Sequence, residues 1–234
     1  MNPRALALLA APALALAASP AAAQNWNATF AETPAQGHRV GDPEAPLQII
    51  EYVSYTCPHC AHFEQESEAQ LRYFYVHEGH AAVEVRHLIR NVIDVAAALV
   101  TECGEEDRFF DNHRTMLHRQ DDWLAKAQAL SPAQQARWQG GSVSSRMRAI
   151  ASDLDFYEMM DGRGLSRSEI DQCLSNEARA RQIAEQSGVN AAEYGVRGTP
   201  SFVLEGTLLE GVHSWPQLNA VLAAAREMPE TVLE

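Results

Sequence analysis

The sequence is short of cysteine, of basic residues and of long apolar runs, and each shortage excludes a class of protein. Four cysteines among 234 residues are too few for a disulfide-dense scaffold. The 18 basic residues are outnumbered by 31 acidic ones, and the net charge of −13 argues against a nucleic-acid partner, which would require basic patches. The residues after Gln24 also lack internal repeats and low-complexity tracts. What remains is the composition of an ordinary globular domain.

The longest apolar run lies at the N-terminus, and it is too short for a membrane anchor. It extends over residues 5–18 and is interrupted by Pro12, whereas a membrane-spanning helix needs roughly 20 apolar residues. Small residues then lead to Ala23 and the polar Gln24, as in the A-x-A-like cleavage site of a secretory signal. We therefore predict a signal peptide over residues 1–23, cleaved near Ala23, and an exported protein.

The residues that follow predict a strand, a helix and a second strand. Residues 24–46 are polar and rich in turn formers, which indicates an arm that leads into the first strand. Residues 47–54 (LQIIEYVS) are mostly β-branched, apolar or aromatic, as in a strand buried on both faces. An apolar stripe then predicts a helix to about His77, and alternation over residues 82–89 predicts the second strand.

A long helical stretch separates this first half from the rest, from about residue 92 to about residue 190. Within it, Asp94 is a candidate N-cap, Ser131-Pro132 is a helix start signal, and residues 166–169 (SRSE) match a capping box. After Gly195 the pattern predicts a hairpin over residues 201–210 and a last helix over residues 214–227. This order predicts an α/β fold with a large helical insertion.

Two of the cysteines stand together as Cys57-Pro58-His59-Cys60, where the first strand passes into the first helix. Unpaired N–H groups and the positive end of the helix dipole favour a thiolate there, and His59 adds a donor or a positive charge. Pro58 suits the first turn of a helix. Cys60 lies about one turn further on, where its sulfur can attack a mixed disulfide held by Cys57. The motif therefore predicts an attacking thiol at Cys57 and a resolving thiol at Cys60.

Other functions of a C-x-x-C motif fit this sequence less well. Haem attachment requires histidine directly after the second cysteine, where this chain has Ala61. A structural zinc site needs four ligands, and the remaining cysteines, Cys103 and Cys173, do not form a second close pair. The histidines show no metal-ligand spacing, so we expect no metal site. A purely structural disulfide remains an alternative, although export and the strand-to-helix position favour catalysis.

Residues 51–60 (EYVSYTCPHC) with residues 61–64 (AHFE) resemble the active-site segment of DsbA-type oxidoreductases. Gly198-Thr199-Pro200, just before a predicted strand, is similar to the second signature of the thioredoxin fold. The resemblance implies a periplasmic protein whose residues 47–234 form a thioredoxin domain with a helical insertion at about 92–190. It also implies a cis peptide bond before Pro200, which faces the active-site disulfide.

The resemblance further implies a role for each matching residue. Cys57 would be the nucleophile, Cys60 the buried resolving thiol, His59 the tuning residue, and Thr199 with Pro200 the substrate-contacting loop. Threonine before the cis-proline is commoner in isomerase branches than in the best-known oxidases, which leaves substrate handling open.

The resemblance extends to two acidic residues near the motif. Glu51 matches an acidic position that assists proton transfer from the buried thiol, because a buried carboxylate has a raised pKa. The alternative for Glu51 is an ordinary paired acid at the end of a strand. Glu64 matches another acidic position, but we expect it on a solvated helix face.

Related proteins often carry a second cysteine pair in the helical insertion. The resemblance thus implies a structural disulfide between Cys103 and Cys173, and an oxidising compartment favours such pairing. Two free buried thiols remain the alternative.

The predicted function is a monomeric dithiol oxidase with no cofactor other than the redox-active Cys57–Cys60 disulfide. It would donate this disulfide to unfolded or reduced exported polypeptides and be reoxidised by a DsbB-type membrane oxidase. A disulfide isomerase or reductase is the first alternative. The second is a holdase that binds unfolded exported chains without catalysis.

Overall fold

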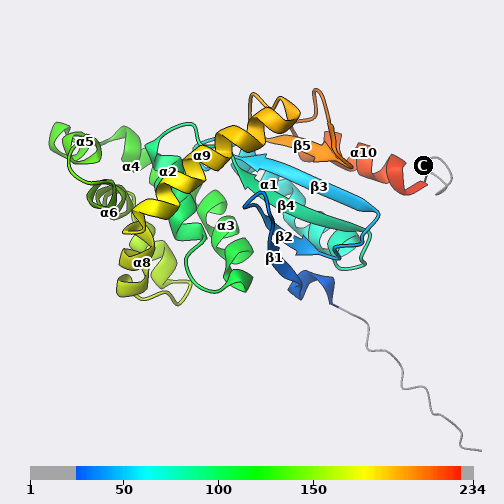
Figure 1. The fold of residues 1–234 in the computed structure, drawn as a ribbon, viewed down its shortest axis with the longest axis horizontal. Coiled ribbons are helices and arrows are strands. Elements are labelled where there is room, and N and C mark those ends of the chain that lie inside the picture. Colours follow the sequence, from blue (N-terminus) through cyan, green and yellow to red (C-terminus); the bar gives the residue numbers. More distant parts are fainter. Residues whose placement is uncertain (1–24, 228–234) are drawn as a thin grey trace, which may run out of the picture.

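The computed structural model describes residues 25–227, so the predicted signal peptide lies outside the described residues. Six strands form one mixed sheet in the order β1-β2-β4-β3-β5-β6. A block of helices lies beyond one end of the sheet (Figure 1). The strands are β1 (Phe30–Glu32), β2 (His38–Gly41), β3 (Leu47–Val53), β4 (Ala81–His87), β5 (Ser201–Leu204) and β6 (Thr207–Leu208).

Strand β3 is central and carries the active-site segment. It pairs in parallel with β4 and antiparallel with β5, so both of its edges are hydrogen-bonded. Most of its side chains are buried, as expected for a run of β-branched and aromatic residues covered on both faces. The strands predicted over residues 47–54 and 82–89 are confirmed as β3 and β4, and the hairpin predicted over 201–210 is confirmed as β5 and β6.

The segment 24–46, predicted to be an arm, instead contributes two strands to the sheet. After the short helix η1 (Trp26–Ala28), β1 pairs with β2, and β2 pairs antiparallel with β4, with His38 opposite Val85. At Gly41 φ is +117°, and a Cβ there would lie 2.8 Å from the carbonyl oxygen of Ala81. These strands have only three and four residues, too few to show a period of two among the turn formers.

Two helices pack with the sheet around a core of apolar side chains. They are α1 (Pro58–Gln70), which continues as the π-helical segment η2 (Leu71–Val76), and α10 (Trp215–Glu227). In this core Phe63 of α1 lies 4.7 Å, centroid to centroid, from Phe202 of β5, and Trp215 packs edge-on to Phe63. The helices predicted to end near His77 and to begin near Trp215 are thereby confirmed.

The predicted helical insertion is confirmed, and it lies between β4 and β5 in the chain. Figure 1 shows α9 running from this block back towards β5, and α9 packs on α2 and β4. The insertion consists of α2 (Val92–Thr101), η3 (Glu106–Arg108), α3 (Phe109–His118), α4 (Gln120–Gln128), α5 (Pro132–Gln139), α6 (Val143–Asp153), α7 (Phe156–Asp161), α8 (Arg167–Leu174) and α9 (Glu177–Tyr194).

The helix starts within the insertion are set by side-chain caps. Capping boxes at Ser131 and Ser166 are present as predicted. The predicted cap at Asp94 is wrong, because Asn91 is the N-cap of α2 and accepts hydrogen bonds from the backbone N–H groups of Ile93 and Asp94. No helix among residues 25–227 is both long enough and apolar enough to cross a membrane.

Candidate active site

The loop between β3 and α1 places Cys57 at the N-cap of α1, and residues of the insertion hold that loop. The buried carboxylate of Asp94 accepts hydrogen bonds from the backbone N–H of Thr56 at 2.9 Å and from the hydroxyl of Ser54 at 3.0 Å. Gln120 of α4 donates from Nε2 to the carbonyl oxygen of Cys57 at 2.9 Å. Sequence reasoning found neither contact, because each partner lies far along the chain from the motif.

Cys57 is only 3% exposed, yet its surroundings favour the thiolate. A hydrogen bond with the Cys60 thiol is the main cause that lowers the pKa of Cys57 to about 5. Burial opposes this shift, while the Thr199 side chain and the backbone N–H groups of Cys60 and His59 contribute to it. The protonated thiol lies 3.2 Å from the carbonyl oxygen of Thr199, to which it donates. A Cys57 with this pKa is a thiolate at neutral pH, the form that attacks disulfides.

The pKa of Cys60 is shifted in the opposite direction. Its side chain is fully buried, and burial raises the pKa of the Cys60 thiol well above its usual value. The neighbouring Cys57 and the charge of Glu51 act in the same direction. One exchangeable proton thus stays on Cys60 while Cys57 is ionised. The first turn of α1 therefore holds one reactive sulfur and one protonated sulfur.

The two residues between the cysteines face solvent. Pro58 occupies the start of α1, where its missing N–H needs no partner. The imidazole of His59 is exposed, and the contribution of His59 to the lowered pKa of Cys57 comes from its backbone N–H. The tuning role of the imidazole stays a prediction.

A loop before β5 faces the cysteines from across the site. The Thr199–Pro200 peptide bond is cis. The Thr199 hydroxyl is buried and makes no full hydrogen bond with a described residue, so it acts on Cys57 as a nearby donor that favours the thiolate. His213 holds the loop, because its Nδ1 donates to the carbonyl oxygen of Pro200 at 2.8 Å. Sequence reasoning missed His213, which no motif marks.

Two carboxyl groups lie beneath the motif, and one of them differs from expectation. Glu51 of β3 is 3% exposed, and burial raises its pKa well above the usual value, with a further contribution from the charge of Glu64. Glu64 is not on a solvated face: it is buried, and burial raises its pKa to about 7. The expectation failed because α3 of the insertion packs on α1 and covers Glu64.

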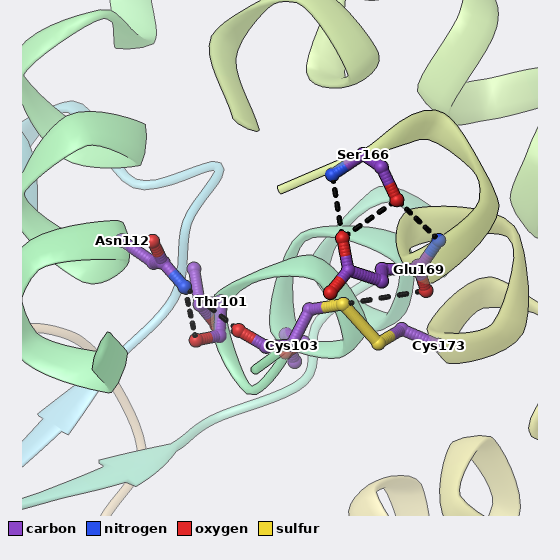
Figure 2. Close-up of a disulfide and its surroundings, with 7 residues drawn as sticks. Thr101, Cys103, Asn112, Ser166, Glu169 and Cys173 are labelled. Carbon is purple, nitrogen blue, oxygen red and sulfur yellow. Dashed lines mark hydrogen bonds between the residues drawn. A yellow bond between two sulfur atoms is a disulfide. The ribbon is translucent and has the colours of Figure 1, made fainter. Parts of the chain in front are cut away.

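The other two cysteines are joined to each other within the insertion. Cys103, after α2, forms a disulfide with Cys173 of α8, across a separation of 70 residues (Figure 2). Asn112 of α3 donates to the carbonyl oxygen of Cys103 at 3.1 Å. Figure 2 also shows the capping box of Ser166 and Glu169 at the start of α8. No residue of this network belongs to the Cys57 loop.

Histidines that are scattered in the sequence meet in the structure. His38 of β2 and His87 of β4 each have Nε2 3.3 Å from the same carboxylate oxygen of Glu102. These groups could hold a metal ion, but Arg179 of α9 already lies 2.6 Å from the other oxygen of Glu102 and supplies a positive charge. The simplest interpretation is an ion-pair network that ties β2 and β4 to the insertion.

Comparisons with known proteins agree with this geometry. The family model described as thioredoxin matches residues 33–224. A crystal structure of a protein-disulfide isomerase from Novosphingobium aromaticivorans is 45% identical, covers 82% of this chain and 98% of its own, and has a TM-score of 0.77. Alpha-DsbA1 of Wolbachia pipientis, at 19% identity with 86% and 96% coverage and a TM-score of 0.66, shares the fold.

A Rickettsia typhi protein with the provisional name protein-disulfide oxidoreductase is also similar. It is 26% identical over 172 residues, which are 73% of this chain and 55% of that protein. The chain thus spans about half the length of the curated relatives it matches.

Proposed function

The chain belongs to the thioredoxin family, in its DsbA-like branch of thiol-disulfide oxidoreductases, and from that premise we propose that it is a dithiol oxidase for exported proteins. The observation that carries the proposal is the opposite pKa shift of the two active-site thiols, with Cys57 lowered and Cys60 raised. Groups that favour the Cys57 thiolate act only when the pair is reduced. They therefore stabilise the reduced protein and make its disulfide an oxidant.

The first half-reaction breaks the protein's own disulfide. A substrate thiolate attacks Cys57 Sγ, a substrate–Cys57 disulfide forms, and the Cys57–Cys60 bond breaks. The electron pair of that bond goes to Cys60 Sγ, which takes up a proton because its pKa is raised. Glu51 is the acid near this sulfur that can supply the proton, since burial raises its pKa and favours its protonated form.

The second half-reaction releases the product. A second substrate thiolate attacks the substrate sulfur of the mixed disulfide, and Cys57 leaves as a thiolate. A low pKa makes Cys57 a good leaving group. The substrate has lost two electrons and gained a disulfide, and the protein holds a Cys57 thiolate and a Cys60 thiol.

Substrates and partners follow from the same proposal. The Thr199–Pro200 loop would contact an extended segment of an unfolded or reduced exported polypeptide. The reduced protein would be reoxidised in the periplasm by a DsbB-type membrane oxidase, and it would work as a monomer with no further cofactor. The predicted signal peptide supports export, and the conditions of the periplasm support a disulfide donor.

A disulfide isomerase is the second candidate, and two observations favour it. Threonine precedes the cis-proline, and the 45% identical Novosphingobium protein bears the name isomerase. An isomerase must be kept reduced, whereas an oxidase must be kept oxidised, so the two functions require different partners.

The test supplies two substrates to the same protein. A fully reduced, unfolded secretory protein should gain its native disulfides on addition of the oxidised enzyme, in stoichiometric amount without a reoxidant. Rapid repair of a scrambled-disulfide substrate by the reduced enzyme, with slow oxidation of the reduced one, would favour the isomerase. A holdase would be favoured if the wild type did not oxidise the substrate and if the Cys57→Ser, Cys60→Ser double variant still suppressed its aggregation.

A further inference from the structure

A cavity of about 160 Å³ lies between the sheet, α1 and α3, beside the active-site carboxyl groups. Glu51 reaches it from β3, Glu64 and Ser67 from α1, and His113 with Arg114 from α3. The cavity is thus built partly by the thioredoxin core and partly by the insertion. Its volume is enough for several water molecules, and its polar lining provides the partners that buried water needs.

Two buried polar atoms that line this cavity have no hydrogen-bond partner among residues 25–227. They are Oε1 of Glu51 and Nε2 of His113, on side chains that are 3% and 2% exposed. A buried polar atom without a partner costs about 1 to 3 kcal/mol, so both atoms call for a partner inside the cavity. Oε2 of Glu64 is 3.8 Å from His113 Nε2, close enough for one small shift or one bridging water.

The other side of the His113 ring fixes which nitrogen carries the proton. Nδ1 is 2.9 Å from the hydroxyl oxygen of Tyr55. The Tyr55 hydroxyl donates its proton to Oγ1 of Thr101, and that hydroxyl donates in turn to the carbonyl oxygen of Ala98. The oxygen of Tyr55 is therefore an acceptor towards His113, and Nδ1 is the protonated nitrogen. Nε2 is left with a free lone pair that faces Glu64.

We propose that His113 is a positioning residue for proton transfer at Cys60: its Nε2 accepts a hydrogen bond from the protonated Glu64 carboxyl and keeps Glu64 as the acid that reprotonates Glu51. The proposal rests on the proposed exchange reaction and adds a residue of the helical insertion to it. When the Cys57–Cys60 bond breaks, the proton passes from Glu51 to the leaving sulfur of Cys60. Glu64 returns a proton to Glu51 and takes one from solvent, which received a proton when the attacking substrate thiol ionised, so the protons balance and each carboxyl group ends as it began.

The electrostatics of the ring agree with a role as acceptor. Burial lowers the pKa of His113 to about 3, with smaller contributions from neighbouring histidines, so the ring stays neutral and does not donate from Nε2. A neutral acceptor favours the protonated form of a carboxyl group. The titratable and charged groups that face Glu64 or its cavity are Glu51 on β3, Glu68 on α1, Arg72 in η2, Asp107 in η3, and Asp111, His113, Arg114 and His118 on α3.

The test measures, as a function of pH, the rate at which a thiolate attacks Cys57 and releases Cys60 Sγ from the disulfide. Oxidised protein is mixed with excess dithiothreitol, the reaction is quenched with a thiol-alkylating reagent, and the rate per dithiothreitol thiolate is followed from pH 5 to pH 9. His113→Asn keeps a donor near the Nδ1 position and removes Nε2. His77→Asn, at an exposed histidine after η2 that lies outside the cavity lining, is the control.

We expect His113→Asn to slow the step about fivefold to tenfold at pH 7.5, the effect of one lost neutral hydrogen bond. The rate should fall with rising pH as Glu64 loses its proton. In His113→Asn this inflection of the pH–rate profile should lie at lower pH, because the protonated Glu64 carboxyl has lost its acceptor. Glu64→Gln should slow the step and remove the Glu64 inflection, while His77→Asn should stay within about twofold of the wild type. A His113→Asn profile that superimposes on the wild type would overturn the proposal.

A second measurement requires no substitution. Nitrogen-15 spectra of the wild type should show His113 neutral, with its proton on Nδ1, down to about pH 5, and an Nε2–H tautomer would refute the hydrogen bond. If the wild-type disulfide does not exchange at all, the proposed function fails. The spectra then still decide the state of His113.

Discussion

The two cysteine pairs of this protein have the same chemistry available to them and very different surroundings. Cys57 and Cys60 lie at the start of α1, beside buried carboxyl groups and a cavity, and their pKa values move in opposite directions. Cys103 and Cys173 are bonded to each other between α2 and α8, in a packed helical block. Hydrogen-bond donors at the start of a helix thus make one pair reactive, whereas packing among helices makes the other pair structural.

The same comparison shows that the insertion does more than cover the site. Asp94, Gln120 and His113 all belong to the insertion, and they contact the loop of Cys57 or face Glu64. The thioredoxin core supplies the reacting sulfurs, and the insertion fixes the backbone that presents them. The disulfide between Cys103 and Cys173 lies within the part of the molecule that provides this support.

The sharpest contrast between the pairs should come from single substitutions at the motif. Cys57→Ser should lower the rate of disulfide exchange by at least about a thousandfold, because no attacking or leaving sulfur remains. Cys60→Ser should still react at Cys57 but accumulate mixed disulfides, since no second sulfur resolves them. Mass spectrometry of trapped adducts checks both. Exchange through Cys60 alone, without Cys57, would contradict the assigned order of attack.

The structural pair should show the reverse response. Removing the disulfide with Cys103→Ser and Cys173→Ser should lower the free energy of unfolding by about 2 to 5 kcal/mol. The pKa of Cys57 should stay near its wild-type value, because its causes are local. Denaturant unfolding and the thiolate absorbance of reduced protein measure the two quantities. A large change in the Cys57 pKa would break the proposed independence of the pairs.

A pH series should separate the reduced protein from the oxidised one. The folded-state pKa of Cys57 is about 5, below the roughly 8.5 of an unfolded thiol. The stabilisation of the reduced form is therefore complete above about pH 8.5 and is lost as pH falls through about 5. Unfolding free energies of both forms at several pH values test this, because Glu51 and Glu64 are present in each. A pH-independent difference between the forms would contradict the lowered pKa.

The smallest expected effect concerns the loop opposite the cysteines. Thr199→Val removes a buried hydroxyl that helps to stabilise the Cys57 thiolate and keeps the side-chain volume nearly unchanged. The pKa of Cys57 should rise by up to about one unit, the effect of a single hydrogen bond. Thiolate absorbance measures the shift, and an unchanged pKa would remove Thr199 from the causes of Cys57 reactivity.

Much of the fold could be predicted from local patterns. The buried run of β3, the capping boxes at Ser131 and Ser166 and the turn at Glu205-Gly206 are local signals, and each element formed where they indicated. The strands β1 and β2 could not be predicted, because their stability comes from pairing with β4 rather than from their own residues.

The residues of the active site also fall into two groups: those that a motif marks, and those whose surroundings depend on distant parts of the chain. The positions of Cys57, Cys60 and Pro200 follow from motifs, so the sequence could mark them. Burial of Glu64 depends on α3, which begins 45 residues later in the chain. No periodicity within α1 could reveal this contact. The role predicted for Asp94 was wrong, because a carboxylate near the start of a helix is typical of an N-cap. In the structure it binds the loop of Cys57 instead.

If the surroundings of Cys57 make the Cys57–Cys60 disulfide an oxidant, its equilibrium with glutathione should show this. Full-length protein is equilibrated in buffers of defined glutathione ratio at pH 7, and the reduced fraction is measured after acid quenching. We expect a reduction potential closer to the about −120 mV of strong disulfide donors than to the about −270 mV of thioredoxin. A value near that of thioredoxin would show that the thiolate of Cys57 does not drive the oxidation of substrates.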